Sequence, residues 1–353
     1  MLTLFLWQKI RTHICAFMTC LLCVIQLLAV HPVAAQTVRL RAVGDIMLAG
    51  EIERLMTKKG LLYPFARMQP VLKGADVTFG NLECCLSTQG KPIPKQFNFR
   101  ADPSEAVVLK QAGFTIVSCA NNHAWDYGRD ALLETVQDVE RTGVVVVGAG
   151  ANRAAAHRLR VITKNGLKIG FLAYLGLIPA LVAESETEPC LSMASVESIR
   201  REVASAHDRV DVLIVSLHAG QEGAPSATPR QRLFAQTAID AGADMVIGHH
   251  PHVVQPMEMY HGKPIFYSLG NFVFSVSGRG SGAMIDATLT RHSVHAKMIR
   301  LVLTDNAQPH LPESKHSRQP IRKGFRSQSP LSVREGGLRN SRRRLQPHVS
   351  EEF

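Results

Sequence analysis

The most informative residues of this sequence are acidic, amide and imidazole side chains that each follow a short apolar run. They occur in five motifs: Gly44-Asp45, Gly80-Asn81-Leu82-Glu83, Asn121-Asn122-His123, His218 and Gly248-His249-His250-Pro251-His252. Carboxylate, amide and imidazole donors without thiolates are typical of manganese, iron or zinc sites, and suit magnesium or calcium less well. Enough donors are present for one or two divalent ions. The motifs therefore predict a metal-dependent hydrolase that acts on a phosphoester or an amide.

The predicted metal ligands share a place directly after an apolar run. They are Asp45, Glu83, Asn122, His218, His249 and His252. His123 is assigned a different role, as the acid that protonates the leaving group. Three imidazoles within four residues, at positions 249, 250 and 252, are natural donors to a cation when neutral, and a purely structural role explains three of them poorly.

Several of these residues also have a structural interpretation. Gly44 is expected to let the chain turn sharply, and Asp45 then suits an N-cap of a helix near residue 48 as well as it suits a metal. Asn81 alone favours a turn, which makes Glu83 the better ligand candidate in that motif. Asp126 either orients His123 or caps the helix that follows, and capping is the favoured interpretation.

The elements that must position these residues are short buried strands alternating with helices. Helices are predicted at 51–58, 64–73, 103–112, 129–141, 194–207 and 229–241, with left-handed glycine caps at positions 113, 143 and 242. This order predicts an α/β protein with a largely parallel sheet, and the site residues meeting at one edge of one sheet. The later segments 264–268, 271–274, 284–290 and 297–303 are predicted hairpin strands of a second sheet or an edge.

The first 35 residues are predicted to be a targeting segment. A basic start precedes a 17-residue apolar run at 14–30, and small residues before Gln36 suit cleavage. A cleaved signal peptide is favoured over an N-terminal anchor. Both alternatives place the working domain, residues 36–305, outside the cytoplasm, in the periplasm or on the outer face of the cytoplasmic membrane.

The net charge of +11 is concentrated at the ends of the chain. Residues 306–353 carry +6 and residues 1–35 carry +2, which leaves only +3 for the domain between them. The tail is poor in apolar residues and is predicted to be disordered. Its charge can attract an anionic polymer or a lipid surface, but no specific nucleic-acid partner is expected.

Four of the seven cysteines lie beyond the predicted leader, at positions 84, 85, 119 and 190. They form no Cys-x-x-Cys pair and no zinc-ribbon spacing. At most one disulfide, from Cys84 or Cys85 to Cys119 or Cys190, is compatible with an oxidising compartment. Burial as small apolar side chains explains them equally well.

The motifs, in this order, resemble the bacterial capsule-synthesis family known as CapA or the poly-gamma-glutamate synthesis family, a branch of the calcineurin-like metallophosphatases. The resemblance covers residues 39–303 and includes Gly44-Asp45, Ala120-Asn-Asn-His, Gly248-His-His-Pro-His and Tyr267-Ser-Leu-Gly-Asn. It implies a four-layer αββα sandwich with the site at the strand ends. It also implies a role in the cell envelope in making, anchoring or exporting an anionic polymer such as poly-gamma-glutamate, together with membrane-bound synthase or export subunits.

One departure from the wider superfamily leaves two hypotheses open. The superfamily has a His two residues after its first Asp, whereas Met47 stands at that place here. The first hypothesis is an exported metallohydrolase that uses the ligands named above. The second is a non-catalytic subunit of a capsule synthesis or export complex, which binds the polymer or acts as a scaffold and has a degenerate metal site.

Overall fold

The computed structural model describes residues 36–177, 184–275, 281–303 and 307–313. The chain divides into two units, Met1–Pro312 and Glu313–Phe353, and all helices and strands of the described residues lie in the first. The predicted leader and residues 314–353 of the predicted tail lie outside the described residues. Within the described part of the chain, no helix has the length and apolar character needed to cross a bilayer.

One sheet is built around β1 (Val38–Ile46), which is buried along almost its whole length. The strand order is β17-β16-β1-β2-β5-β6, and β15 also pairs with β1. The other strands are β2 (Val77–Leu82), β5 (Ile116–Ser118), β6 (Val145–Val147), β15 (Asn271–Val273), β16 (Gly282–Thr290) and β17 (Ser293–Leu301). Strands β1, β2, β5 and β6 are parallel, so that their carboxyl ends lie at one edge. The predicted hairpin of β16 and β17 extends this sheet on the other side of β1.

A second sheet has the order β13-β14-β12-β11-β9-β8. Its strands are β8 (Arg160–Lys164), β9 (Leu167–Leu175), β11 (Val212–His218), β12 (Met245–His249), β13 (Met257–Tyr260) and β14 (Lys263–Phe266). The central strands β9, β11, β12 and β14 are parallel, and β8 and β13 are antiparallel edges. The remaining described strands form two small two-stranded sheets. They are β3 (Cys85–Leu86) with β4 (Arg100–Ala101), and β7 (Ala149–Gly150) with β10 (Cys190–Leu191).

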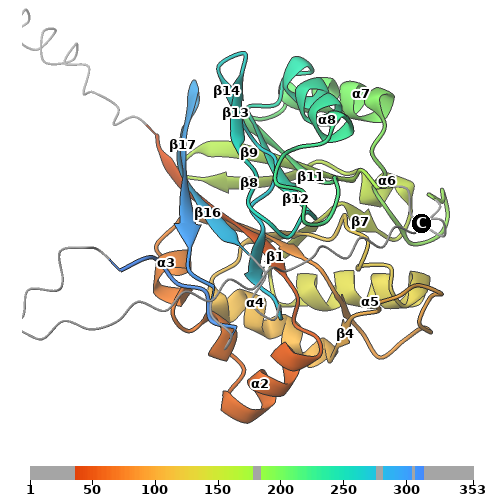
Figure 1. Ribbon diagram of the computed structural model, residues 1–353. Helices are drawn as coiled ribbons and strands as arrows, with labels where there is room; N and C mark the ends of the chain where they lie inside the picture. Colours follow the sequence, from red (N-terminus) through yellow and green to blue (C-terminus); the bar gives the residue numbers. More distant parts are fainter. Residues whose placement is uncertain (1–35, 178–183, 276–280, 304–306, 314–353) are drawn as a thin grey trace, which may run out of the picture. The chain divides into compact units, whose positions relative to one another are not determined.

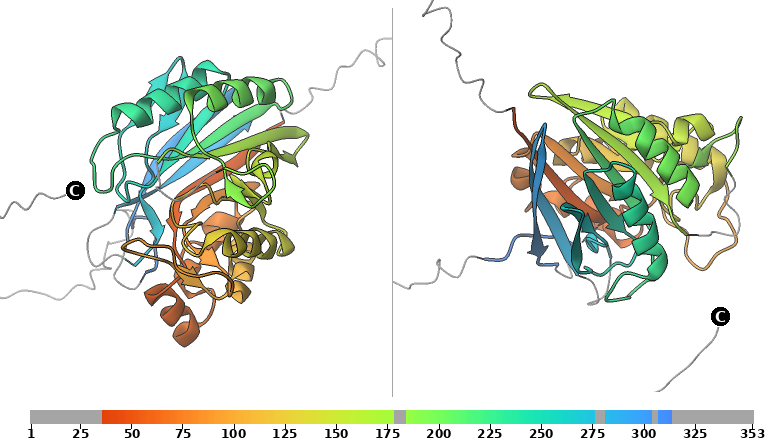
Figure 2. Two further views of the ribbon diagram at one scale, coloured as in Figure 1. Left: turned by 90° about the vertical axis from the view of Figure 1, so that its right-hand side faces the viewer. Right: turned by 90° about the horizontal axis from the view of Figure 1, so that it is seen from above.

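Helices cover the outer face of each sheet (Figures 1 and 2). The first sheet packs against α2 (Glu51–Lys59), η1 (Tyr63–Phe65), α3 (Gln69–Lys73), α4 (Ala106–Ala112) and α5 (Gly128–Arg141). The second packs against α7 (Val196–His207) and α8 (Pro229–Asp240). Two short helices, η2 (Pro103–Glu105) and α6 (Arg153–Ala156), join neighbouring elements. The predicted four-layer α/β sandwich is therefore confirmed.

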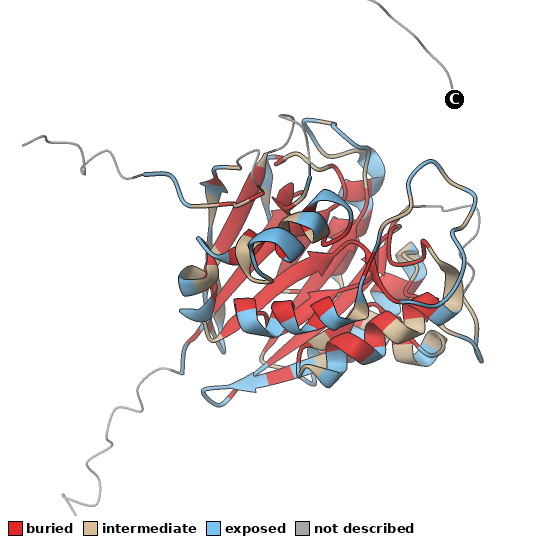
Figure 3. Ribbon diagram, turned by 90° about the horizontal axis from the view of Figure 1, so that it is seen from below, coloured by how far each residue is buried: buried red, intermediate tan, exposed pale blue. Residues whose placement is uncertain are grey.

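The two sheets face each other across an apolar core that contains no helix residues (Figure 3). Side chains from β1 and β2 meet side chains from β9, β11 and β12 in this layer. The rings of Phe79 and Phe171 stack across the interface with their centroids 5.9 Å apart. Burying such a ring contributes about 1.5–3 kcal/mol, so these contacts hold the sheets at a fixed separation.

Local sequence signals predict most helices correctly. The predicted helices at 51–58, 129–141, 194–207 and 229–241 correspond to α2, α5, α7 and α8, and α8 begins with Pro229 inside a capping box formed by Thr228 and Gln231. The predicted caps Gly113, Gly143 and Gly242 all have positive φ. The single helix predicted at 64–73 is wrong, because the chain forms η1 and then begins α3 at Gln69, with Pro70 in its first turn.

The expectation that the site residues share one edge of one sheet is also wrong. Asp45 belongs to the first sheet, whereas His218 and His249 belong to the second. A strand that is buried on both faces has the same apolar sequence in either sheet, so the pattern of residues does not reveal which sheet contains it.

The four described cysteines, at positions 84, 85, 119 and 190, are buried and free. Burial raises the pKa of the Cys85 thiol to about 12 and raises that of Cys84 well above its usual value. Such thiols are unreactive and pack as small apolar side chains, so the disulfide alternative is wrong for these residues.

Candidate metal centre

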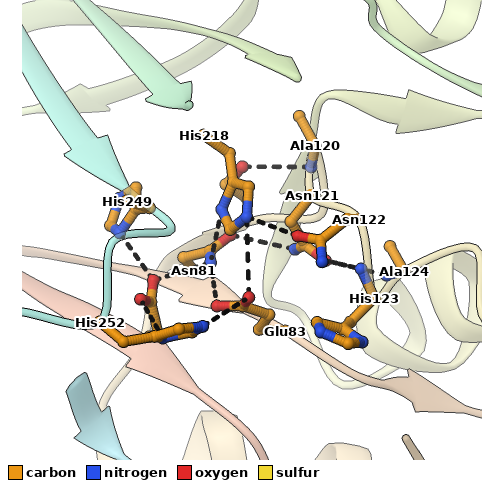
Figure 4. Close-up of polar contacts among 12 residues, drawn as sticks. Asn81, Glu83, Ala120, Asn121, Asn122, His123, Ala124, His218, His249 and His252 are labelled. Carbon is orange, nitrogen blue, oxygen red and sulfur yellow. Dashed lines mark hydrogen bonds and ion pairs between the residues drawn. The ribbon is translucent and has the colours of Figure 1, made fainter. Parts of the chain in front are cut away.

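The predicted site residues meet where strands of both sheets end. Asp45 lies near the end of β1, and Glu83 directly follows β2, while His218 and His249 are the last residues of β11 and β12. Asn122 and His123 follow β5, and His252 lies in the loop after β12. Figure 4 shows the side chains of Glu83, Asn122, His123, His218, His249 and His252 gathered in one region, and Asp45 joins them through its contacts with His249 and His252. The structure therefore brings together all the residues for which the sequence predicts a site role.

Two glycines allow the strands to approach closely enough for this arrangement. A Cβ atom on Gly44 would lie 1.8 Å from the carbonyl oxygen of Gly270, and one on Gly248 would lie 2.0 Å from that of Tyr267. Gly44 is inside β1 and has no positive φ, so the expected sharp turn is wrong. Its role is to let β15 pair with β1, which places Asn271 beside Asp45.

Asp45 is fully buried and contacts two imidazoles and an amide. Its Oδ1 lies 3.2 Å from Nδ1 of His249 and accepts a hydrogen bond from Nδ2 of Asn81 at 2.9 Å. Its Oδ2 lies 3.2 Å from Nδ1 of His252. Burial alone would raise the pKa of Asp45, but the contacts with His249 and His252 hold it well below its usual value. Asp45 is therefore ionised, and the N-cap interpretation is wrong because α2 has Gly50 at its N-cap.

Glu83 has the opposite electrostatic character. Its Oε2 accepts from Nδ2 of Asn81 at 3.1 Å, whereas Oε1 lies 3.6 Å from Nε2 of His218 and 3.7 Å from Nε2 of His252. Burial and the nearby Asp45 carboxylate raise the pKa of Glu83 well above its usual value. Burial and Asp45 therefore outweigh the attraction of His252 and favour the protonated form of this carboxyl.

The imidazoles differ in protonation. Burial and the neighbouring His250 lower the pKa of His218 well below its usual value, and burial with His252 lowers that of His250 to about 4. Burial would also lower the pKa of His252, but Glu83 and Asp45 raise it to about 10. His218 and His250 are therefore neutral, which is the form that binds cations.

The backbone around the last motif is strained. His250 has a φ of 97° and His252 a φ of 57°, in the left-handed region that residues other than glycine rarely adopt. Each such residue costs about 1–3 kcal/mol, and strain of this kind concentrates at functional sites. The fold therefore holds these two imidazoles in position at the expense of stability.

The donor set fits a divalent cation. Asp45, Glu83 and His218 offer donor atoms within 4.8 Å of one another, and so do Glu83, His250 and His252. Among the described residues, Asp45 Oδ2, Glu83 Oε1 and His249 Nε2 are buried and have no hydrogen-bond partner. Buried polar atoms without partners are rare, because each costs about 1–3 kcal/mol, and a bound cation would satisfy these atoms.

His123 lies beside this cluster and is held by its own set of contacts. Its Nδ1 is 2.9 Å from Oδ2 of Asp126 and 3.2 Å from Nζ of Lys95, and its ring centroid is 4.5 Å from that of Phe99. Lys95 also forms an ion pair with Asp126. Asp126 thus orients His123, and the favoured prediction that it caps α5 is wrong, since Tyr127 occupies that N-cap.

Three residues that the sequence does not place among the ligands belong to the cluster. Asn81 lies within β2, and its amide contacts Asp45, Glu83 and His218, so the turn interpretation is wrong. His250 stands next to His218, with ring centroids 4.9 Å apart. Oδ1 of Asn271 lies 2.9 Å from Nδ1 of His252. Only the apolar residues before Asn81 and Asn271 could have indicated their burial.

Met47 contributes packing rather than a ligand to this region. Its side chain is buried in the apolar core between the first sheet and its helices, and its backbone N–H donates to Val273 at 2.8 Å. The thioether therefore supplies packing at the position where the superfamily has an imidazole.

The protein is a four-layer α/β sandwich with a candidate divalent-metal centre. Buried carboxylates, amides and imidazoles at the strand ends form this centre. Residues 39–276 match the family described as "Bacterial capsule synthesis protein PGA_cap". The chain belongs to this family, which confirms the resemblance recognised in the sequence.

Two curated relatives and one solved structure are similar to the chain. "PGA biosynthesis protein CapA" of Bacillus subtilis is 34% identical over 66% of this chain and 62% of the relative. "Capsule biosynthesis protein CapA" of Bacillus anthracis is 32% identical over 66% of this chain and 58% of the relative. The chain therefore spans about three fifths of the length of these two relatives. The NAD nucleotidase of Haemophilus influenzae is 10% identical, with a TM-score of 0.48, over 79% of this chain and 54% of the nucleotidase.

Proposed function

We propose that this protein acts in the synthesis of an envelope polymer of the poly-gamma-glutamate type, and that its PGA_cap domain is a metal-dependent hydrolase of a phosphoester or an amide. The family and the names of the Bacillus relatives support the process. The buried donor cluster supports the activity. The protein is exported, to the periplasm or the outer face of the cytoplasmic membrane, where membrane-bound synthase or export subunits are its partners.

The proposed metal ligands are Asp45, Glu83, Asn122, His218, His249 and His252, and we add His250 because it offers a donor atom within 4.8 Å of those of Glu83 and His252. The absence of thiolates from the cluster favours manganese, iron or zinc, as one or two ions. A divalent cation supplies Lewis-acid polarisation of a phosphoryl or carbonyl group. Neutral His218 and ionised Asp45 are already in the protonation states that binding requires, whereas Glu83 and His252, whose pKa values are raised, would release their protons when the cation binds.

His123 acts as the general acid. Its Nδ1 lies 2.9 Å from Oδ2 of Asp126, which fixes the ring and leaves Nε2 to donate a proton to the departing atom. The contact with Phe99 and the ion pair between Lys95 and Asp126 limit the rotation of the ring. The same three contacts return the ring to one orientation after each proton transfer.

A single observation carries this proposal: Glu83 Oε1 is buried 3.6 Å from Nε2 of His218 and 3.7 Å from Nε2 of His252 and has no hydrogen bond from any described residue. Elemental analysis of the purified domain tests it directly. We expect near-stoichiometric manganese, iron or zinc, and hydrolysis of 4-nitrophenyl phosphate or of gamma-glutamyl-4-nitroanilide.

The matched variants are Glu83→Gln and Glu202→Gln, since both glutamates contact a histidine in the folded protein. Glu83→Gln should lose the metal and at least about a hundredfold in turnover, and Glu202→Gln should retain both. Wild-type protein that folds normally but contains and binds no transition metal would contradict the proposal.

The buried Met47 favours a second candidate, a polymer-binding subunit without catalysis. In that case poly-gamma-glutamate should bind equally well to wild type and to Glu83→Gln, and neither should hydrolyse the model substrates. Removal of residues 306–353 should weaken this binding, because ten Lys and Arg residues are lost with the tail. The size of this weakening should depend steeply on the salt concentration. Binding that is unchanged by this deletion would exclude a role for the tail.

A further inference from the structure

A pocket of about 380 Å³ opens directly beside the candidate metal centre. Its lining includes His123 and His252, which the proposed function names as acid and ligand. Nε2 of His252 is 3.7 Å from Oε1 of Glu83, so the pocket begins at the donor cluster itself. A group that leaves a reacting centre held by the cluster would therefore occupy this pocket.

The wall of the pocket is aromatic. The rings of Phe97 and Phe99 are parallel within 4°, with centroids 6.4 Å apart, and Phe274 meets Phe99 edge to face at 6.4 Å. Phe274 also packs on the ring of His252 at 4.7 Å. Phe97 is 59% exposed, which is unusual for a large apolar side chain and leaves its face free to contact a ligand.

The polar groups of the pocket carry both signs. Among the described residues that line it, Glu222 is the only carboxylate, and neither Lys nor Arg is present. His252 also lines the pocket, and its raised pKa of about 10 makes it a cation. Charge therefore does not decide what the pocket binds, and the aromatic wall is its distinguishing feature.

We infer that this pocket selects substrates whose leaving group is an uncharged aromatic or other flat apolar group. The inference rests on the proposed hydrolase function and narrows its substrate class.

Binding of two phosphonates to the manganese-loaded protein tests this inference without turnover. Isothermal titration calorimetry should show that phenylphosphonate binds about tenfold more tightly than methylphosphonate, because only the phenyl group can pack on the aromatic wall.

A matched pair of variants connects the selectivity to the named residues. Phe97→Ala should reduce the preference for the phenyl group to about threefold or less. Leu233→Ala, at an exposed leucine on α8 that does not line the pocket, is the control and should leave both affinities unchanged.

The outcomes separate the pocket from the metal centre. Protein that binds manganese but binds phenylphosphonate and methylphosphonate equally overturns the inference and leaves the hydrolase proposal standing. A phenyl preference that persists in Phe97→Ala also overturns it. Protein that takes up no manganese overturns the hydrolase proposal, and the assignment of the pocket fails with it.

Discussion

Two clusters of histidine and carboxylate side chains, one buried and one partly buried, differ in how completely their polar atoms are satisfied. In the His157 cluster, which consists of His157, Glu184 and Glu202, both nitrogens of the imidazole are used. Nδ1 lies 2.8 Å from Glu202 and Nε2 lies 2.5 Å from Glu184. Each glutamate also contacts an arginine, Arg153 or Arg201. The cluster is therefore electrically balanced by protein groups alone.

The strand-end cluster around Asp45 and Glu83 has similar side chains, but several of its polar atoms are not satisfied by the protein. Two of its carboxylate oxygens and one nitrogen each of His249 and His250 have no hydrogen-bond partner among the described residues. The difference shows that histidine beside glutamate does not by itself indicate a metal site. The useful signal is a buried donor set that the protein does not satisfy.

The largest expected effect follows from removal of the metal. Chelation should lower the free energy of unfolding of the metal-loaded wild type by roughly 3 kcal/mol, the value expected when free metal stands roughly 100-fold above its Kd. The variant Asp45→Asn lacks one charged ligand and should change little on chelation. Chemical denaturation with and without chelator measures both. Equal effects in the two proteins would mean that the bound metal lies elsewhere.

A smaller change in the free energy of unfolding is expected when the His157 cluster is disrupted. His157→Ala leaves Glu184 and Glu202 partly buried without the imidazole between them, and should lower the free energy of unfolding by about 2 kcal/mol. Metal content should not change. The control is His261→Ala, because His261 is 69% exposed and lies 3.7 Å from Asp240, an arrangement worth about 0–1 kcal/mol. Loss of metal in His157→Ala would contradict the separation of the two clusters.

The pH dependence of this effect follows from three pKa shifts. Burial would lower the pKa of His157, but Glu202 and Glu184 raise it, so its contribution is full below about pH 6.5 and is lost as the pH rises through the raised value. Burial would raise the pKa of each glutamate, but hydrogen bonds lower both, so their contribution is lost as the pH falls below about 4.5. The difference between wild type and His157→Ala should therefore be largest between about pH 5 and 6, as urea denaturation at several pH values would show.

The smallest effect concerns Glu105, which is buried like Glu83 but has no histidine beside it. Burial and the charge of Glu53 raise its pKa to about 7, and its Oε2 has no hydrogen-bond partner among the described residues. The ionised form is therefore penalised in the folded protein, and Glu105→Gln should raise the free energy of unfolding by about 1 kcal/mol at pH 8. At pH 4, where the carboxyl is protonated, the two proteins should be equally stable. A stabilisation that is the same at both pH values would exclude this explanation.

The sequence predicts the layers of the fold better than it predicts the pairing of strands. The helices α5 and α7 have clear amphipathic patterns, and α7 and α8 begin with capping boxes, which are local signals. By contrast, β15 pairs with β1 across more than two hundred residues, and Gly44 makes that pairing possible through a contact with Gly270. No local pattern of residues encodes such a contact.

The same limit applies to the site. Asp45, Glu83 and the histidines were predictable, because charged and imidazole groups directly after buried strands are unusual. Asn81 and Asn271 were not, since asparagine after glycine normally indicates a turn and its burial depends on strands from distant parts of the chain. The strained φ of His250 is likewise set by packing around the loop and is absent from the sequence pattern.

The stacked rings of Phe79 and Phe171 have a consequence that reaches beyond the apolar core. Phe79 also lies against the imidazole of His249, with centroids 5.9 Å apart, so one ring touches both the opposite sheet and a candidate ligand. The thickness of this aromatic pair sets the distance between the donor atoms on the first sheet and those on the second. A narrower side chain at either position would change that distance, and with it the size of cation that the donors could hold, although no donor would have been altered.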